Sequence, residues 1–457
     1  MSQKSRIHIP ERGAATVYIA AIVSVLVALS APVFIRNQLH YSKKAALSKT
    51  HVKGLLTARS GISYGLEKIR KELGEEETPG DTGVLFGNDP FSDDTAHFEK
   101  EEPLIEGGEL SLSLFSGSGQ GECILSAEPE GDVLYVVSKS VYMGDSSQAS
   151  AGLASRVFRT PDTVLYLEKK GEVTGSGLID GETVFQDDAS SELKKRFKVS
   201  KDLLKSSIKE YRTALTSIRA AEFPGTPLNI TTSEELIDIP DTVKGPLFID
   251  GTGYKVSGEI DKTVYALEEV QITGDVHIKG ISIAADKDVK LLDNAHLEDV
   301  EVYTSARFYM SGNSVFSGSC IARGDIEVFQ EAEIRNKSIF ISIGEMKRED
   351  IKERKPFSIF FRDEITADGV FIDLRGKGGI SISEGSVIKG VLWSNSEILH
   401  NGVAEGFVRA GRLISRNIND TASGNFLEGD INRFDRIDEY WLPYYIGLPE
   451  ILTWRER

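Results

Sequence analysis

Cysteine is scarce in this sequence of 457 residues, in which only Cys123 and Cys320 occur. Two thiols so far apart in the chain do not form the disulfide framework that stabilises small secreted domains. We therefore interpret both as small apolar side chains that are buried in a core.

Positive charge is also in short supply. The chain has 53 Lys and Arg residues against 70 Asp and Glu residues, which gives a formal net charge of -17. Because binding to phosphate backbones requires a basic surface, this balance excludes nucleic acid as the main partner.

Motifs that carry chemistry are missing. The sequence has no Cys/His spacing typical of a zinc site and no nucleophile elbow. The glycine-rich stretches 251–253 and 376–379 lack the lysine and Ser/Thr spacing of a phosphate loop, so we interpret them as turns. These absences predict a protein that is not an enzyme and that needs no cofactor.

Two sets of side chains are candidate sites. His277 and His296 occupy equivalent positions of successive repeats and are expected to stack on adjacent turns, as a solvated ladder. A polysaccharide-active enzyme would instead need a pair of carboxylates. The densest acidic cluster consists of Asp363, Glu364, Asp368 and Asp373. Such clusters arise from composition alone in a chain with 70 acidic residues.

Long hydrophobic runs are absent, with one exception. The stretch from Gly13 to Ile35 contains no charged residue. As a helix it would be about 34 Å long, and the hydrocarbon core of a bilayer is about 30 Å thick. The run therefore predicts a transmembrane helix at 13–35. A cleaved secretory signal ending near Ala28-Leu29-Ser30 and an ordinary membrane anchor are alternative interpretations.

Apolar periodicity predicts that this helix continues as an amphipathic stalk over 36–73. The stripe steps by three, four and seven residues, although Gly61 and Gly65 each disfavour a helix by about 1 kcal/mol relative to Ala. Its members are Val52, Leu55, Leu56, Ile62, Leu66, Ile69 and Leu73. We expect one face of this helix to pack on its own domain and to contact neighbouring subunits as well.

Two further units follow the stalk. Short alternating segments predict a small antiparallel sheet within 74–170, laid against the helix. Helical spacing returns at 187–223, where Leu204, Ile208, Tyr211 and Leu215 step by four, three and four. We interpret 187–223 as a helix that connects the sheet to the next domain.

The junction before the hydrophobic run resembles a known family. A basic leader at 1–12 ends in Glu11-Arg12-Gly13-Ala14, and the apolar helix follows at once. This resembles PilX-type minor type IV pilins and the K-type pseudopilins of type II secretion. The resemblance implies prepilin-peptidase processing between Gly13 and Ala14. Most pilins carry glutamate at the fifth mature position, whereas this chain has Tyr18.

The resemblance also implies a location. It places the C-terminal body outside the cytoplasm, in the periplasm or beyond, so that the chain would be a single-pass inner-membrane protein. A count of Lys and Arg on either side of 13–35 favours the opposite orientation. We follow the resemblance and keep the second orientation as an alternative.

A short repeat of nearly constant length begins at position 247 or close to it. It places Ile278, Leu297, Val315 and Ile334 in one column. Further columns hold Ile283, Val302, Ile321 and Ile341, and then Leu292, Met310 and Phe329. A constant period with short apolar segments predicts a parallel β-solenoid over 247–420. The solenoid resembles bactofilins, and 421–457 is expected to cap its open end.

These segments together predict a mixed fold: a transmembrane and stalk helix, a small antiparallel α+β pilin-like head and a C-terminal parallel β-solenoid. The function that we expect is a structural minor pilin or pseudopilin with partners in the membrane and in other pilin subunits. The alternatives are a membrane-tethered scaffold that self-associates through its solenoid like a bactofilin, and a polysaccharide-active β-helix enzyme.

Overall fold

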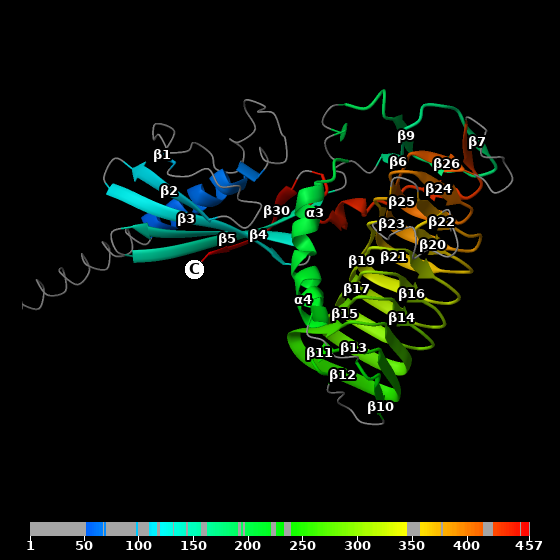
Figure 1. The fold of residues 1–457 in the computed structure, drawn as a ribbon. Helices are drawn as coiled ribbons and strands as arrows, with labels where there is room; N and C mark the ends of the chain where they lie inside the picture. Colours follow the sequence, from blue (N-terminus) through cyan, green and yellow to red (C-terminus); the bar gives the residue numbers. More distant parts are fainter. Residues whose placement is uncertain are drawn as a thin grey trace, which may run out of the picture.

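The computed structural model contains two β bodies joined side by side (Figure 1). The structure describes residues 52–66, 68–69, 97–98, 109–116, 119–130, 132–142, 145–156, 162–190, 193–194, 197–220, 225–232, 239–344, 357–375, 378–414, 424–447 and 449–456.

The first body is an antiparallel sheet in which neighbouring strands follow the order of the chain from β1 to β5. These strands are β1 (His97–Phe98), β2 (Glu109–Ser116), β3 (Gly119–Glu130), β4 (Val133–Tyr142) and β5 (Asp145–Arg156). The other edge of β5 pairs with β29 (Trp441–Leu442) and β30 (Pro449–Glu456), both from the end of the chain. The sheet therefore unites segments from both halves of the sequence.

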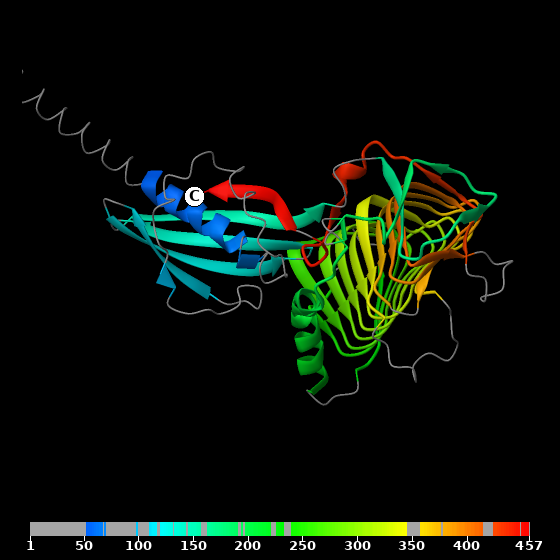
Figure 2. The ribbon, with the colours of Figure 1, turned by 90° about the horizontal axis from the view of Figure 1, so that it is seen from above.

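A helix at 52–66 lies across one face of this sheet (Figure 2). Its buried side includes Ala58, Ile62 and Leu66. Small residues let the helix approach closely: a Cβ added at Gly61 would collide with Ser138 Oγ and would lie 2.5 Å from Cys123 Sγ. Gly61 is therefore required by the packing, although glycine disfavours a helix in isolation.

The second body is a parallel β-solenoid, as the repeat predicts. Its first strands are β10 (Leu228–Thr232), β11 (Thr242–Val243), β12 (Leu247–Ala266), β13 (Val270–Ala285), β14 (Val289–Leu291), β15 (His296–Thr304), β16 (Phe308–Met310), β17 (Val315–Ala322), β18 (Ile326–Val328) and β19 (Glu333–Ser342). It continues through β20 (Ile359–Phe361), β21 (Thr366–Asp373), β22 (Gly379–Ile382), β23 (Val387–Ser394), β24 (Glu397–His400), β25 (Val403–Ala410), β26 (Arg412–Ile414), β27 (Asn425–Leu427) and β28 (Asp430–Asn432).

The core of the solenoid consists of inward rows of apolar side chains. One row runs Ile278, Leu297, Phe316 and Ile334. The expected column differs from it at one position, because Val315 pairs with His296 while Phe316 faces the core. The other columns are also displaced by one residue at some positions. Cys320 and Phe340 take the places expected for Ile321 and Ile341. Leu291 and Val328 take those expected for Leu292 and Phe329. The register between β15 and β17 shifts between Leu297 and Val300, which changes the length of the coil at this point. A shift of one residue exchanges the two faces of a strand.

The last coil of the solenoid comes from an earlier part of the sequence. The strands are β6 (Thr163–Leu167), β7 (Val173–Gly175), β8 (Ile179–Asp180) and β9 (Glu182–Phe185). β6 pairs in parallel with β25, β7 with β27, and β8 with β28. The chain thus leaves the sheet, forms the far end of the solenoid, and only then reaches the first coil.

The return path is helical. α3 (Lys201–Ser207) and α4 (Lys209–Ala220) run along the solenoid toward β10 and β12 (Figure 1). Ile208 and Leu215 pack on Ala284 and Tyr303, which point outward from the solenoid but are buried. The Tyr211 ring stacks on that of Tyr303 with centroids 5.5 Å apart. This face of the solenoid is therefore covered by the chain itself.

One hydrophobic cluster continues from the sheet into the solenoid. It includes Leu134 of the sheet, Trp393 and Phe407 of the solenoid, and Tyr445 of the segment between them. That segment contains the 3-10 helix η3 (Ile437–Glu439). Within the segment 421–457, expected as a cap, β27 and β28 belong to the end of the solenoid together with β7 and β8. The residues 433–447 instead fill the junction, and 449–456 complete the sheet.

The structure corrects the expected fold class and location. The part of the chain that it describes is mostly β, and none of its helices is long and apolar enough to cross a membrane. The predicted fold class, an N-terminal transmembrane and stalk helix with a small antiparallel α+β head, is therefore wrong, and no helix of the described residues supports the predicted single-pass inner-membrane protein. The sheet is not self-contained, since β29 and β30 complete it and 163–167 belongs to the solenoid. The run 13–35 and the Gly13–Ala14 junction lie outside the described residues.

Candidate functional site

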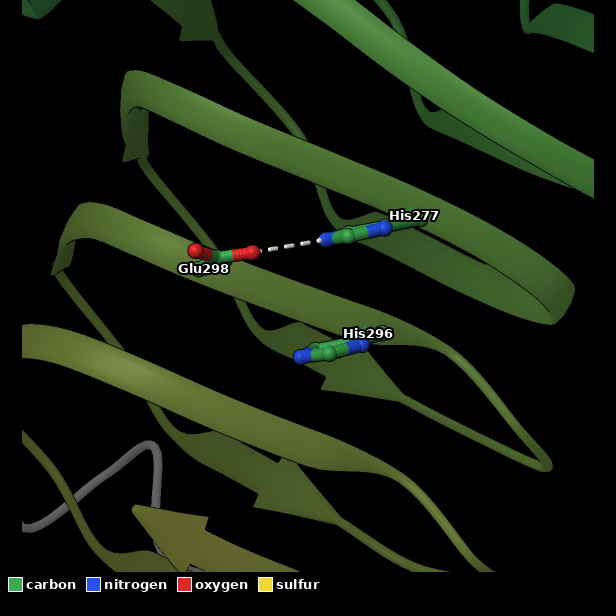
Figure 3. Close-up of side chains that lie close together, drawn as sticks. All are labelled: His277, His296 and Glu298. Carbon is green, nitrogen blue, oxygen red and sulfur yellow. Dashed lines mark hydrogen bonds and ion pairs between the residues drawn. The ribbon is translucent and has the colours of Figure 1, made fainter. Parts of the chain in front are cut away.

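Three polar side chains meet on the outer surface of the solenoid (Figure 3). His277 belongs to β13, and His296 and Glu298 belong to β15 on the next coil. The strand register places His277 directly beside His296, and Lys279 directly beside Glu298. Because side chains alternate along a strand, His296 and Glu298 share the outward face while Leu297 points into the core.

The three side chains are close enough to act together. The imidazole rings of His277 and His296 are parallel within 4°, and their centroids are 4.3 Å apart. His277 Nε2 lies 3.2 Å from Glu298 Oε2. One nitrogen or oxygen atom from each of the three residues lies within 4.8 Å of the other two. Stacking of the two histidines, expected from their positions in the repeat, is confirmed.

Local electrostatics favour a neutral imidazole beside an ionised carboxylate. Burial lowers the pKa of His296 below its usual value, and the neighbouring His277 lowers it further. Hydrogen bonding from the Lys279 ammonium lowers the pKa of Glu298. At neutral pH the cluster therefore offers unprotonated nitrogen and a negatively charged oxygen, which are the donor forms that bind metal ions.

Glu298 was missed as a member of this cluster by reasoning from the sequence. The signal was present in the repeat, where His277-Ile278-Lys279 aligns with His296-Leu297-Glu298 on the next coil. If two outward positions of each coil are compared instead of one, the alignment also identifies Glu298.

The acidic cluster considered for catalysis does not form one site. The Asp363 carboxylate accepts a hydrogen bond of 3.1 Å from the Gln330 backbone N–H, and Asp368 accepts one from the Tyr440 hydroxyl. Asp373 is buried and accepts hydrogen bonds from Ser358, from Ser394 at 2.9 Å and from the Arg375 N–H at 3.1 Å. Glu364 is exposed. Each of the three aspartates thus accepts hydrogen bonds from a different set of neighbouring groups.

A carboxylate pair that the sequence did not reveal lies where the two β bodies meet. Asp132 follows β3, and its carboxylate faces the hydroxyls of Ser319 and Tyr445. Glu301 of β15 lies close by and accepts a hydrogen bond of 2.9 Å from the Tyr211 hydroxyl. Burial, reinforced by the charge of Glu301, raises the pKa of Asp132 to about 7. We therefore expect the stability of this junction to depend on pH.

The two cysteines and the glycine-rich stretch 251–253 lie in surroundings that indicate a structural role. Cys123 and Cys320 are both buried free thiols, as expected. Burial raises the pKa of the Cys123 thiol to about 11 and that of Cys320 well above its usual value. The stretch 251–253, expected as a turn, lies within β12 at a break in its register with β13.

Comparison with known proteins does not identify a family for this chain. No protein-family model matches the sequence, and no curated protein does. Among solved structures, the crystal structure of the competence-associated pilin ComZ from Thermus thermophilus aligns at 10% sequence identity. The alignment covers 89% of this chain and 97% of that chain, with a TM-score of 0.18. A TM-score this low does not establish a shared fold.

Proposed function

We propose that this chain is a non-enzymatic structural subunit of a type IV pilus or related secretion fibre, in which the helix at 52–66 contacts neighbouring subunits. The observation that carries the proposal is the two-sided character of this helix. One side packs on the antiparallel sheet, and the other side presents apolar residues to solvent.

The exposed apolar residues share one face. Val52 is 50% exposed and Leu56 is 36% exposed, and residues four apart lie on the same side of a helix. Ala58 and Ile62, in contrast, are buried against the sheet. A helix that packs its own domain with one face and exposes apolar side chains on the other is suited to assembly with other subunits.

The solenoid would serve as a rigid body that displays an interaction surface. Its aromatic residues support this role: Phe308, Phe316 and Phe340 form a continuous contact series in the core, and Trp393 is buried at the junction with the sheet. These four residues thus do not form an exposed platform for sugar rings. The acidic residues considered for polysaccharide chemistry are engaged separately, which favours the structural role over the enzymatic one.

Self-association through the ends of the solenoid, as in a bactofilin-like scaffold, is the less favoured alternative. The coil beyond β25 is supplied by β6 of the same chain. The edge of β25 is therefore paired within the molecule, and a second copy would have to pair with β9 at this end instead.

Photo-crosslinking tests the proposed contact. A photoreactive amino acid at position 56 should crosslink to other fibre subunits in intact cells, whereas the same group at position 178, a leucine that is 69% exposed at the far end of the solenoid, should crosslink much less. Leu56→Asp should reduce incorporation into the fibre while Leu178→Asp leaves it unchanged, with both variants keeping the thermal unfolding midpoint of the parent. Incorporation of Leu56→Asp at the parental level, without crosslinks from position 56, would refute the proposal.

A further inference from the structure

We propose that His277, His296 and Glu298 bind a divalent first-row transition-metal ion such as Zn²⁺ on the outer face of the solenoid. This inference does not depend on the proposed role in a fibre. It concerns the only group of three or more metal-binding side chains found within the part of the chain that the structure describes.

The donor set suits such an ion. Two imidazole nitrogens and one carboxylate oxygen are common ligands of Zn²⁺, which binds them at roughly 2.0–2.2 Å. Hard cations such as Mg²⁺ prefer oxygen ligands only. The donor atoms already lie within 4.8 Å of one another, so side-chain movements without backbone change can bring them to one point.

The movement required is a rotation of the two rings. In the structure the rings are stacked, so their nitrogens point in parallel directions and not toward a common centre. Torsions about the Cβ–Cγ bond of histidine have broad minima. Because His277 and His296 are both partly exposed, their rings can turn toward a shared ion without repacking the core.

The backbone beneath the cluster is rigid. His277 and His296 are paired residues of neighbouring parallel strands, and Glu298 follows two positions later on the same strand as His296. Such strands fix the Cα positions, which reduces the entropy lost when the ligands converge. Three ligands from this surface leave a fourth position for water or for a donor from another molecule.

One interaction competes with the ion. The Lys279 ammonium forms an ion pair with Glu298 and lies 3.6 Å from Asp299. A metal ion would have to displace this lysine from Glu298. Removing the lysine amine is therefore expected to strengthen metal binding, an effect that a purely structural cluster would not show.

Isothermal titration of the full chain, without a polyhistidine tag, tests the site. With ZnCl2 at pH 7.5 we expect saturable binding of one ion per chain, weakened about tenfold or more in His277→Ala, His296→Ala and Glu298→Gln. Lys279→Ala should bind more tightly than the parent. Glu269→Gln removes a carboxylate from a comparable lysine pair on the same solenoid, the Glu269–Lys290 pair, and should leave binding unchanged.

A spectroscopic measurement separates this site from others. Co²⁺ bound at the site should give the visible absorption bands typical of four-coordinate cobalt. The proposal fails if the parent shows no saturable binding, or if the double variant His277→Ala/His296→Ala, with an unchanged unfolding midpoint, still binds one ion at the parental affinity.

Discussion

Arg409 donates a hydrogen bond of 2.5 Å to Glu168, a residue 241 positions earlier in the chain. Arg409 lies in β25, and Glu168 directly follows β6. The guanidinium group also donates to Asn395 at 2.7 Å and lies 4.5 Å from the centre of the Trp393 ring. This buried arginine thus fastens the coil from the first half of the chain to the solenoid from the second half.

Replacing this arginine should loosen the last coil. Arg409→Met removes one partner of a largely buried ion pair, a change that costs about 3–5 kcal/mol when both partners are fully buried. Because Glu168 remains 30% exposed, we expect a loss on the order of 2–3 kcal/mol. Hydrogen exchange at 163–167 should become faster than in the parent.

A surface pair provides the control for Arg409. Arg433 is 42% exposed and pairs with Asp162 at 2.9 Å. Arg433→Met should cost less than about 1 kcal/mol, since exposed ion pairs contribute little. Equal effects of the two substitutions on exchange in β6 would contradict the role of Arg409.

Gly61 should not tolerate a methyl group. Alanine is favoured over glycine in a helix by about 1 kcal/mol, but its Cβ would lie within 2.5 Å of Cys123 Sγ and Ser138 Oγ. Overpacking typically costs about 1–3 kcal/mol, so we expect Gly61→Ala to lower the free energy of unfolding.

Removing Cys123 Sγ and Ser138 Oγ tests whether steric overlap with these two atoms causes the loss of stability. Adding Cys123→Ala and Ser138→Ala to Gly61→Ala should restore part of the loss, whereas Ser63→Ala at an exposed position of the same helix should change stability by less than about 0.5 kcal/mol. Chemical denaturation provides the comparison. A stable Gly61→Ala protein would mean that the helix lies farther from the sheet.

The register of β17 can be tested with two neighbouring residues. Phe316 is fully buried, and its ring centroid lies 5.0 Å from that of Phe340. Phe316→Ala should cost about 3–5 kcal/mol in urea-induced unfolding. Val315 is only partly buried on the outer side, so Val315→Ala should cost less than about 1 kcal/mol. The reverse order would place Val315 in the core row instead.

Asp132 should make stability depend on pH. Its pKa is raised from 3.8 to about 7 in the folded protein, so the folded state holds this proton more tightly than the unfolded state. The resulting stabilisation is fully present below about pH 4 and is lost as the pH rises through about 7. Asp132→Asn removes the charge and should raise the thermal unfolding midpoint above pH 7 relative to the parent.

The control for Asp132 is an exposed carboxylate. Asp180→Asn in β8 should leave the dependence of the unfolding midpoint on pH, measured from pH 5 to 8.5, parallel to that of the parent. If Asp132→Asn also gives a parallel curve, Asp132 is not the group that couples the junction to pH.

Much of the solenoid was predictable because its signal is local. The repeat period follows from coil length, and it correctly paired Ile278 with Leu297 and His277 with His296. It failed where two apolar residues are adjacent, as at Val315 and Phe316, because hydrophobicity alone does not say which of them faces inward. It also left Glu298 unassigned, because only one outward position of each coil was considered, although this carboxylate lies 3.2 Å from His277.

The sequence by itself thus determined the parallel solenoid, the helical character of 52–66 and the stacked histidines, because repeat length and side-chain periodicity act within one or two coils. Only the tertiary structure decided that Leu165 pairs with Val408, that β30 completes the sheet at β5, and that Asp132 lies near Glu301. Such pairings join segments far apart in the sequence. They depend on which strand edges and apolar faces remain open once the local elements have formed, and no local pattern encodes that.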